Sequence, residues 1–100
     1  MIIRGTTPDL EFELPLDTSQ LAKGFVTVVQ NDTVVLEKPL ADCILTDNKL
    51  TVALTQEETL RLSADVCAEI SLVVVTEDGE RFENLPFVER VYDTAKNEVI

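Results

Sequence analysis

The clearest pattern along the chain is the strict alternation of apolar and acidic residues in DLEFEL, residues 9–14. In an extended chain Leu10, Phe12 and Leu14 fall on one side and the three acids fall on the other, which is typical of a half-buried β-strand. Carboxylates spaced along one strand face usually meet solvent. The acidic row therefore indicates an exposed face in preference to a metal site.

Five further runs have the composition of strands, because they contain many β-branched residues. They are GFVTVVQ (24–30), TVVLEKPL (33–40), CILT (43–46), KLTVAL (49–54) and AEISLVVV (68–75). Asn31-Asp32 separates the first pair and Asp47-Asn48 the second, and both dipeptides suit the positive φ of hairpin turns. In the last run, alternate residues from Ala68 to Val74 are expected in the core.

After this run the chain returns through its strongest hairpin signal, Asp78-Gly79. The return strand is expected to start at residues 80–82. Pro86 interrupts it, because proline cannot donate a hydrogen bond to a β-ladder. A bulge or a sheet edge is therefore predicted there, with FVERVY (87–92) continuing the strand.

One segment between two strands carries the start signal of a helix: LTQEETLRL, residues 54–62. Thr55 is a good N-cap, and Glu58 three residues later completes a capping box. Glu57 and Glu58 also place negative charge near the positive end of the helix dipole. Two turns are too short to be stable alone, so the helix must be held by packing at one end of the strands.

Together these elements predict an all-β fold: an antiparallel two-sheet, immunoglobulin-like sandwich of about seven or eight short strands, with one short helix near residues 55–62. Antiparallel pairing is expected because parallel neighbours need long crossover connections. The 100 residues correspond to a single β-sandwich domain, residues 1–100. A chain of this size can bury one core without metal or disulfides.

The charge is one-sided, with 19 acidic and 8 basic residues and a formal net charge of −11. No cluster of Lys and Arg is present, so neither nucleic acid nor a membrane surface is expected as a partner. The longest apolar run, residues 72–75, is far shorter than the ~20 residues of a membrane span. The start, MIIRGTTPD, has no secretory signal, which predicts a soluble protein that stays in the cytoplasm on synthesis.

Reaction chemistry has little support in the composition. The chain has no His, which excludes Ser–His–Asp and Cys–His nucleophile systems. Its three glycines, at positions 5, 24 and 79, cannot form a phosphate-binding loop. Carboxylate pairs could act as acid and base, but the acid-rich places coincide with expected caps and turns: Glu57/Glu58, Glu77/Asp78/Glu80 and Glu83. No enzymatic activity, catalytic residue, metal or cofactor is therefore expected.

Cys43 and Cys67 form no CxxC pair, and there is no His to complete a metal set. Both are interpreted as small buried apolar residues in a reducing compartment. A disulfide between them is possible only if their strands are neighbours.

Several predicted strands are apolar on both faces, whereas the exposed face of an antiparallel sheet is normally polar. With the alternate residues in the core, the outward-facing set is Phe25, Val29, Val35, Val73 and Val75. Scattered exposed valines are normal, which is the simpler explanation. The other explanation is a sheet face or edge used for self-association into a homo-oligomer or for docking on another protein. These five residues are the predicted interface.

The order of the parts carries a family resemblance. A G-T-T-P lead is followed by the alternating strand LEFEL, a hairpin around QND (30–32), the stretch LTVALTQEETL (50–60) and a long apolar strand closed by TEDGE (76–80). Over about residues 5–91 this order resembles small phage and prophage tail-associated β-sandwich proteins of Gram-positive bacteria. It is similar in particular to the N-terminal domain of phage upper-baseplate proteins.

This resemblance implies a non-enzymatic structural or adaptor protein of the virion, which docks on other phage tail or baseplate proteins. It supplies no catalytic residues. Two other interpretations stay open: a small acidic inhibitor or regulatory protein of a mobile element that blocks a basic site, and a generic immunoglobulin-like module. Salt separates the inhibitor from apolar docking, because charge-driven binding weakens steeply with ionic strength.

Overall fold

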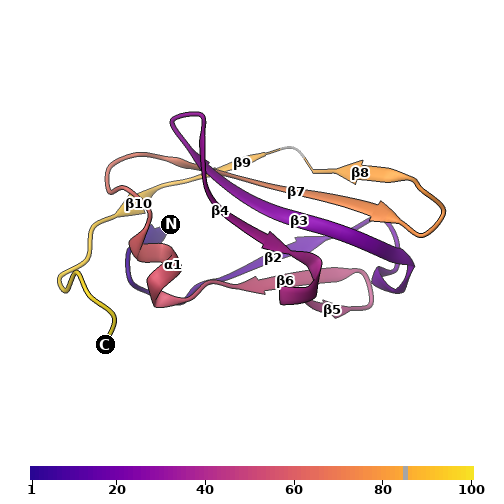
Figure 1. Cartoon of the computed structure of the whole chain (residues 1–100), viewed down its shortest axis with the longest axis horizontal. Helices are drawn as coiled ribbons and strands as arrows, with labels where there is room; N and C mark the ends of the chain where they lie inside the picture. Colours follow the sequence, from indigo (N-terminus) through magenta and orange to yellow (C-terminus); the bar gives the residue numbers. More distant parts are fainter. Residues whose placement is uncertain (85) are drawn as a thin grey trace.

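The computed structural model describes residues 1–84 and 86–100. It consists mostly of β-strands in two stacked sheets, with one short α-helix at one end of the stack (Figure 1). The helix α1 spans Gln56–Leu60, and the 3-10 turns are η1 (Thr18–Gln20) and η2 (Leu40–Asp42). The strands are β1 (Ile2–Ile3), β2 (Asp9–Glu13), β3 (Leu21–Gln30), β4 (Thr33–Pro39), β5 (Ile44–Thr46), β6 (Lys49–Ala53), β7 (Ala68–Thr76), β8 (Arg81–Glu83), β9 (Phe87–Glu89) and β10 (Val91–Tyr92).

The smaller sheet has the strand order β2-β6-β5, and the larger sheet has the order β4-β3-β7-β8, with β9 also pairing with β7. All pairs within these two sheets are antiparallel, as the hairpin pattern predicts. Within the described residues, no helix is long and apolar enough to cross a membrane.

β1 and β10 form a separate pair that runs parallel, with Ile2 opposite Val91. The expectation of purely antiparallel pairing is wrong here. The two strands come from opposite ends of the chain, so no tight turn fixes their relative direction. The predicted interruption at Pro86 is confirmed, because β8 ends before it, β9 begins after it and both strands pair with β7 at the sheet edge. The predicted single strand over 87–92 is wrong, because β9 pairs with β7 whereas β10 pairs with β1.

The core lies between the inner faces of the two sheets. In β2, the buried Leu10 and Phe12 alternate with exposed acids, as the sequence pattern predicts. The face of β7 from Ala68 to Val74 is at most 1% exposed. Val26 and Val28 of β3, Leu36 of β4, and Leu50, Val52 and Leu54 in and after β6 complete this apolar layer. Burial of these alternating faces holds the two sheets together.

Hairpin turns form at the residues that the sequence indicates. Asn31 and Asp32 both have positive φ, 50° and 61°, between β3 and β4. Asp47 has φ 51° between β5 and β6, and Gly79 has φ 92° between β7 and β8. These residue types reach the left-handed region at low cost, so the turns are fixed locally.

The helix α1 begins where its capping box predicts. The Thr55 hydroxyl accepts a hydrogen bond from the Glu58 N–H at 3.2 Å, and the Glu58 carboxylate accepts one from the Thr55 N–H at 2.9 Å. The helix ends at Leu60, two residues earlier than predicted. After Leu60 the chain tightens into bonds of the 3-10 type, from Arg61 N–H to Glu58 O and from Leu62 N–H to Thr59 O.

Glu58 also joins the helix to the edge of the larger sheet. Lys38 Nζ, on β4, lies 3.0 Å and 2.9 Å from its two carboxylate oxygens, and both side chains are largely buried. Burial alone would raise the pKa of Glu58, but the hydrogen bonds from Lys38 and Thr55 outweigh it and hold the pKa below its ordinary value. An inward-pointing lysine also discourages the edge strand β4 from pairing with another strand.

The N-terminal segment is tied to the same helix. Arg4 donates hydrogen bonds to the carbonyl oxygens of Leu60 at 2.9 Å and Leu62 at 2.6 Å, which are groups that a helix end leaves unpaired. The buried Thr59 hydroxyl accepts from the Gly5 N–H at 2.9 Å and donates to Thr6 O at 2.8 Å. A helix too short to be stable alone is thus held by tertiary contacts, as expected.

We expect Thr55→Ala to lower the free energy of unfolding by about 1 kcal/mol, because the helix start loses its side-chain acceptor. A urea titration followed by circular dichroism measures the change. Thr7→Ala is the matched control, because Thr7 is exposed and lies outside regular structure. Equal midpoints for Thr55→Ala and the wild type would contradict the capping role.

We expect Glu58→Gln to lower the free energy of unfolding at neutral pH by roughly 1–2 kcal/mol, because charge-assisted hydrogen bonds from Lys38 are lost. The folded pKa of Glu58 lies below the ordinary value of 4.5, so the unfolded chain binds the extra proton. The stabilisation is therefore fully present above pH 4.5 and is lost as the pH falls through the folded pKa.

Urea titrations at a series of pH values should show Glu58→Gln and the wild type converging in acid. Glu57→Gln is the control, since Glu57 is an exposed residue of the same helical turn that pairs with Arg61. Its effect should be about 0.2–0.5 kcal/mol. A stability difference at Glu58 that does not change with pH would contradict this account.

Candidate protein-protein interface

The predicted interface residues belong to the larger sheet, whose outer face is a regular grid. Directly opposed residues of antiparallel strands share a face, so the register sorts this surface into rows. In order along the strands, the rows are Arg81–Val75–Lys23, Glu83–Val73–Phe25–Pro39, Ser71–Thr27–Glu37 and Val88–Glu69–Val29–Val34.

Four of the five predicted residues lie on this face. Phe25 is 42% exposed, and Val29, Val73 and Val75 are half-buried between their neighbours. They do not form one patch, because the polar row Ser71–Thr27–Glu37 crosses the sheet between them. Phe25, Val73 and Val75 gather at one end of the sheet, and Val29 lies at the other.

Val35 does not lie on the outer face, and its prediction as an outward residue is wrong. The register between β3 and β4 shifts, so that Val28 faces Leu36 but Val29 faces Val34. Val35 is the extra residue of this β-bulge, and it packs against the core. Val34 takes its place on the outer face, 55% exposed. The run Val34-Val35-Leu36 is apolar throughout, so alternation alone could not locate the bulge.

Phe25 also borders an open hollow at the edge of the stack, where the end of β4 leads through η2 to β5. Its lining is mostly apolar and includes Pro39, Leu40 and Leu45. Gly24 also lines it, and a Cβ at this position would come within 2.9 Å of Val73 O and Val74 Cγ1. Glycine therefore permits the close approach of β3 and β7 beside Phe25.

Two of the chain's few cationic side chains lie at the Phe25 end of the sheet, where Glu83 is also exposed. Lys23 and Arg81 flank Val75 in the terminal row. Arg81 Nη2 lies 3.2 Å from Glu83 Oε1, an exposed pair of little energetic weight. Lys23 makes no ion pair within residues 1–84 and 86–100. Apolar and cationic side chains therefore meet on one small surface.

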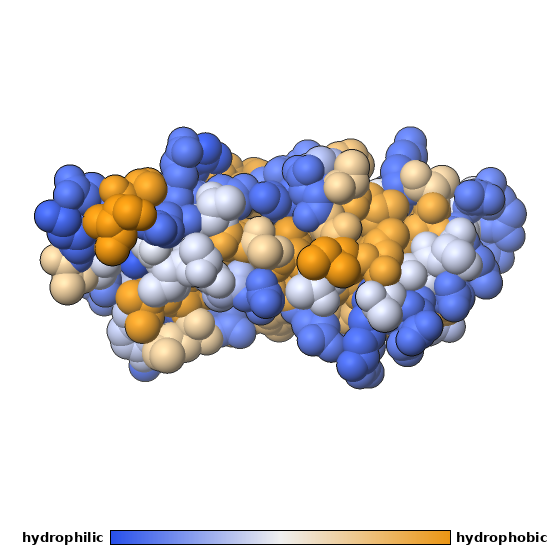
Figure 2. All heavy atoms as spheres, turned by 90° about the horizontal axis from the view of Figure 1, so that it is seen from below, coloured by the Kyte–Doolittle hydropathy of each residue, from blue (hydrophilic) through white to orange (hydrophobic). Residues whose placement is uncertain are grey.

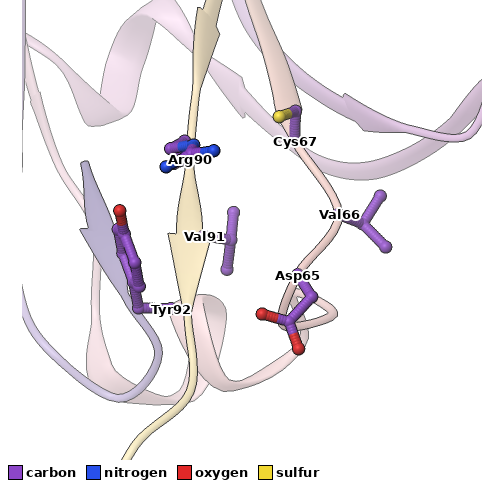
Figure 3. A pocket seen from close by; sticks show the side chains of 6 residues that line it. All are labelled: Asp65, Val66, Cys67, Arg90, Val91 and Tyr92. Carbon is purple, nitrogen blue, oxygen red and sulfur yellow. The ribbon is translucent and has the colours of Figure 1, made fainter.

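A second hollow, of about 220 Å³, lies between β10 and the segment that leads into β7 (Figure 3). Arg90, Val91 and Tyr92 line it from one side, and Asp65, Val66 and Cys67 from the other. Arg90 is the sole cation of this lining, and no residue in it can act as a base toward Cys67 as a histidine would.

The acid-rich places at Glu57/Glu58 and Glu77/Asp78/Glu80 lie in a helix start and a turn, as predicted, but Glu83 lies in strand β8, so its predicted place in a turn or cap is wrong. Glu58 belongs to the capping box. Asp78, in the turn after β7, accepts a hydrogen bond from the Thr76 hydroxyl, which lowers the pKa of that carboxyl. Among the described residues, no group of three His, Cys, Asp or Glu side chains is placed to hold a metal ion.

Both cysteines are free. Cys43 is half-buried and packs against the core, and burial raises the pKa of its thiol. Cys67 is exposed just before β7, so its expected burial is wrong. Cys67 lies outside the alternating apolar face that begins at Ala68, and nothing in the local sequence marks that boundary.

Comparison with known proteins reveals no relative: no protein-family model matches the chain, and no curated protein or solved structure matches it. Functional inference for this chain therefore depends on its own sequence and geometry.

We expect Phe25→Ala to lower the free energy of unfolding by at most about 1 kcal/mol, because it removes only cross-strand contacts with Val73 and Pro39. Leu72→Ala is the matched core variant at a residue 1% exposed, and it should cost about 2–5 kcal/mol. Urea titration compares the two. Equal losses would show that Phe25 is a core residue and not a surface anchor.

Proposed function

We propose that this chain is a non-enzymatic structural or adaptor protein of a phage tail or baseplate, made in the cytoplasm and then incorporated into the virion. It docks on other tail or baseplate proteins through the outer face of its larger sheet. The observation that carries this proposal is the group of Phe25, Val73 and Val75 on a sheet face where polar side chains are the norm.

The finer fold assignment in this proposal is an immunoglobulin-like sandwich. In that fold one sheet contains strands B, E and D in this order, and the variable type extends the other sheet to C′, C, F and G. The order β2-β6-β5 fits B-E-D, and the order β4-β3-β7-β8 fits C′-C-F-G. This assignment also gives α1 a defined place, as the connection between strands E and F.

The sequence resemblance supports the same function. The segments that carry it correspond to β2, the β3–β4 hairpin, the passage from β6 into α1, and the hairpin that follows β7. They make up most of the two sheets, so the resemblance concerns the scaffold as a whole. It names the class of partner, other tail proteins, but not the residues that touch them.

Physical features of the Phe25 surface suit docking. Its aromatic side chain is held on a rigid, paired strand, so little conformational entropy is lost when a partner covers it. Aromatic and arginine side chains are also the residue types that most often dominate the binding energy of interfaces. Arg81 lies in the row next to that of Phe25 on the same face of the sheet.

A second candidate function is the acidic inhibitor that blocks a basic site. One observation favours it: Asp9, Glu11 and Glu13 are all exposed on the outer face of β2. Binding through this row would weaken steeply with salt, whereas apolar docking through Phe25, Val73 and Val75 would depend on salt far less.

The test is incorporation into particles. Phage particles induced from the strain that encodes the chain should contain it after gradient purification, detected by a specific antibody. Phe25→Asp should reduce its incorporation strongly while the free protein stays folded, and Thr27→Asp, in the neighbouring polar row, is the control. Particles that assemble without the chain in them would overturn the proposal.

A further inference from the structure

We propose that copies of this chain associate head to tail, with the Phe25 end of the larger sheet of one copy packed on the outer face of the smaller sheet of the next. This inference rests on the proposed function, because it takes the Phe25 surface as a docking surface. It also identifies what binds to the Phe25 surface, namely a second copy of the chain.

The first surface, which we call the basic-apolar surface, consists of Lys23, Phe25, Val73, Val75 and Arg81. All five lie in the two adjacent terminal rows of the larger sheet. Phe25 supplies a large apolar side chain, and Lys23 and Arg81 lie on either side of Val75. Glu83, in the same two rows, pairs with Arg81, so Lys23 is the cation of this surface without an ion pair among the described residues. A complementary partner must therefore offer apolar contacts flanked by carboxylates.

The second surface, which we call the acidic surface, consists of Asp9, Glu11, Glu13, Ile44 and Ala53. The register of the smaller sheet places them together, with Asp9 opposite Ala53, and Glu11 and Ile44 on either side of Thr51. Ile44 is 66% exposed, among the most exposed large apolar residues of the chain. Figure 2, seen from the side of the smaller sheet, shows apolar atoms framed by hydrophilic ones.

The two surfaces match in charge and in apolar content. Two cationic side chains lie on either side of Val75 on the first surface. On the second, three acidic side chains line β2, and the exposed Ile44 lies two strands away on β5. Lys49 partly neutralises Glu11 at 3.3 Å, while Asp9 and Glu13 form no ion pair within the described residues. In a chain of net charge −11, the basic-apolar surface is a natural acceptor for the acidic face of another copy.

The position of the two surfaces decides the symmetry of the contact. They lie on the outer faces of two stacked sheets and so point in opposite directions (Figure 1). Contact between them is heterologous, and successive copies form a ring or an open filament. A contact between two basic-apolar surfaces would instead bring Lys23 and Arg81 of two copies together, and like charges oppose it.

Charge reversal tests the contact. One variant carries Lys23→Glu and Arg81→Glu, and the other carries Glu11→Lys and Glu13→Lys; all four residues are exposed. Sedimentation equilibrium at low salt should show concentration-dependent association of the wild-type chain. Each variant alone should associate about tenfold more weakly or not at all, because its two surfaces then carry like charges. Circular dichroism and urea titration check that each variant stays folded.

Mixing the two variants is the decisive step. In an equimolar mixture every basic-apolar surface meets an acidic surface of opposite charge on the other variant, so association should return. If the contact joined two copies of the same surface, the variant in which that surface is unchanged would keep wild-type association on its own. That result would overturn the head-to-tail contact.

A wild-type chain that remains monomeric at every concentration and salt would also overturn self-association. That outcome is distinguishable from failure of the proposed function, because incorporation into particles is measured separately. A monomer that enters particles would dock on other tail proteins only, and a self-associating chain absent from particles would have another use.

Discussion

The carboxylate of Glu58 joins the short helix α1 to the edge of the larger sheet, and the connection between the two sheets depends on this contact. It accepts a hydrogen bond from the Thr55 N–H, which helps to start α1. It also accepts a hydrogen bond from Lys38 Nζ, which ties the helix to the edge of the larger sheet. The chain passes through this point from the smaller sheet to the larger one. The short helix cannot persist by itself, and the pair is well placed to fix how the two sheets are joined at this end.

Contacts on the other side of α1 complete this arrangement. Arg4 donates hydrogen bonds to carbonyl oxygens at the end of the helix. The Thr59 hydroxyl forms hydrogen bonds with the backbone of Gly5 and Thr6. Through them the first strand is set beside the last, and β1 pairs with β10 although the two are at opposite ends of the sequence. The helix thus acts as a connector and not as a separate layer.

The composition of the outer sheet faces has a different cause from that of the core, because folding of the domain does not require these faces to be apolar. Phe25 lies on a strand that is paired on both sides, so its position is rigid. The lysine and arginine beside it stand out in a chain dominated by acids, and three exposed acids line the outer face of β2. Rigid surfaces of opposite character on the two sides of one thin domain suit a protein that acts by being placed between others.

The sequence by itself determined the features whose causes are local. Alternation in DLEFEL defines the buried face of β2, Thr55 and Glu58 define the start of α1, and Asn31-Asp32 defines a hairpin turn, because each depends on neighbouring residues only. The outward positions of four of the five predicted interface residues follow from the same two-residue alternation of a strand. Only the tertiary structure decided the rest. Val35 packs against the core because a β-bulge breaks the two-residue period. β1 pairs with β10 because the two ends of the chain are brought together, and Lys38 contacts Glu58, which lies 20 residues away in the sequence. These outcomes depend on which strands pair and in what register, and such long-range choices leave no periodic trace in the chain.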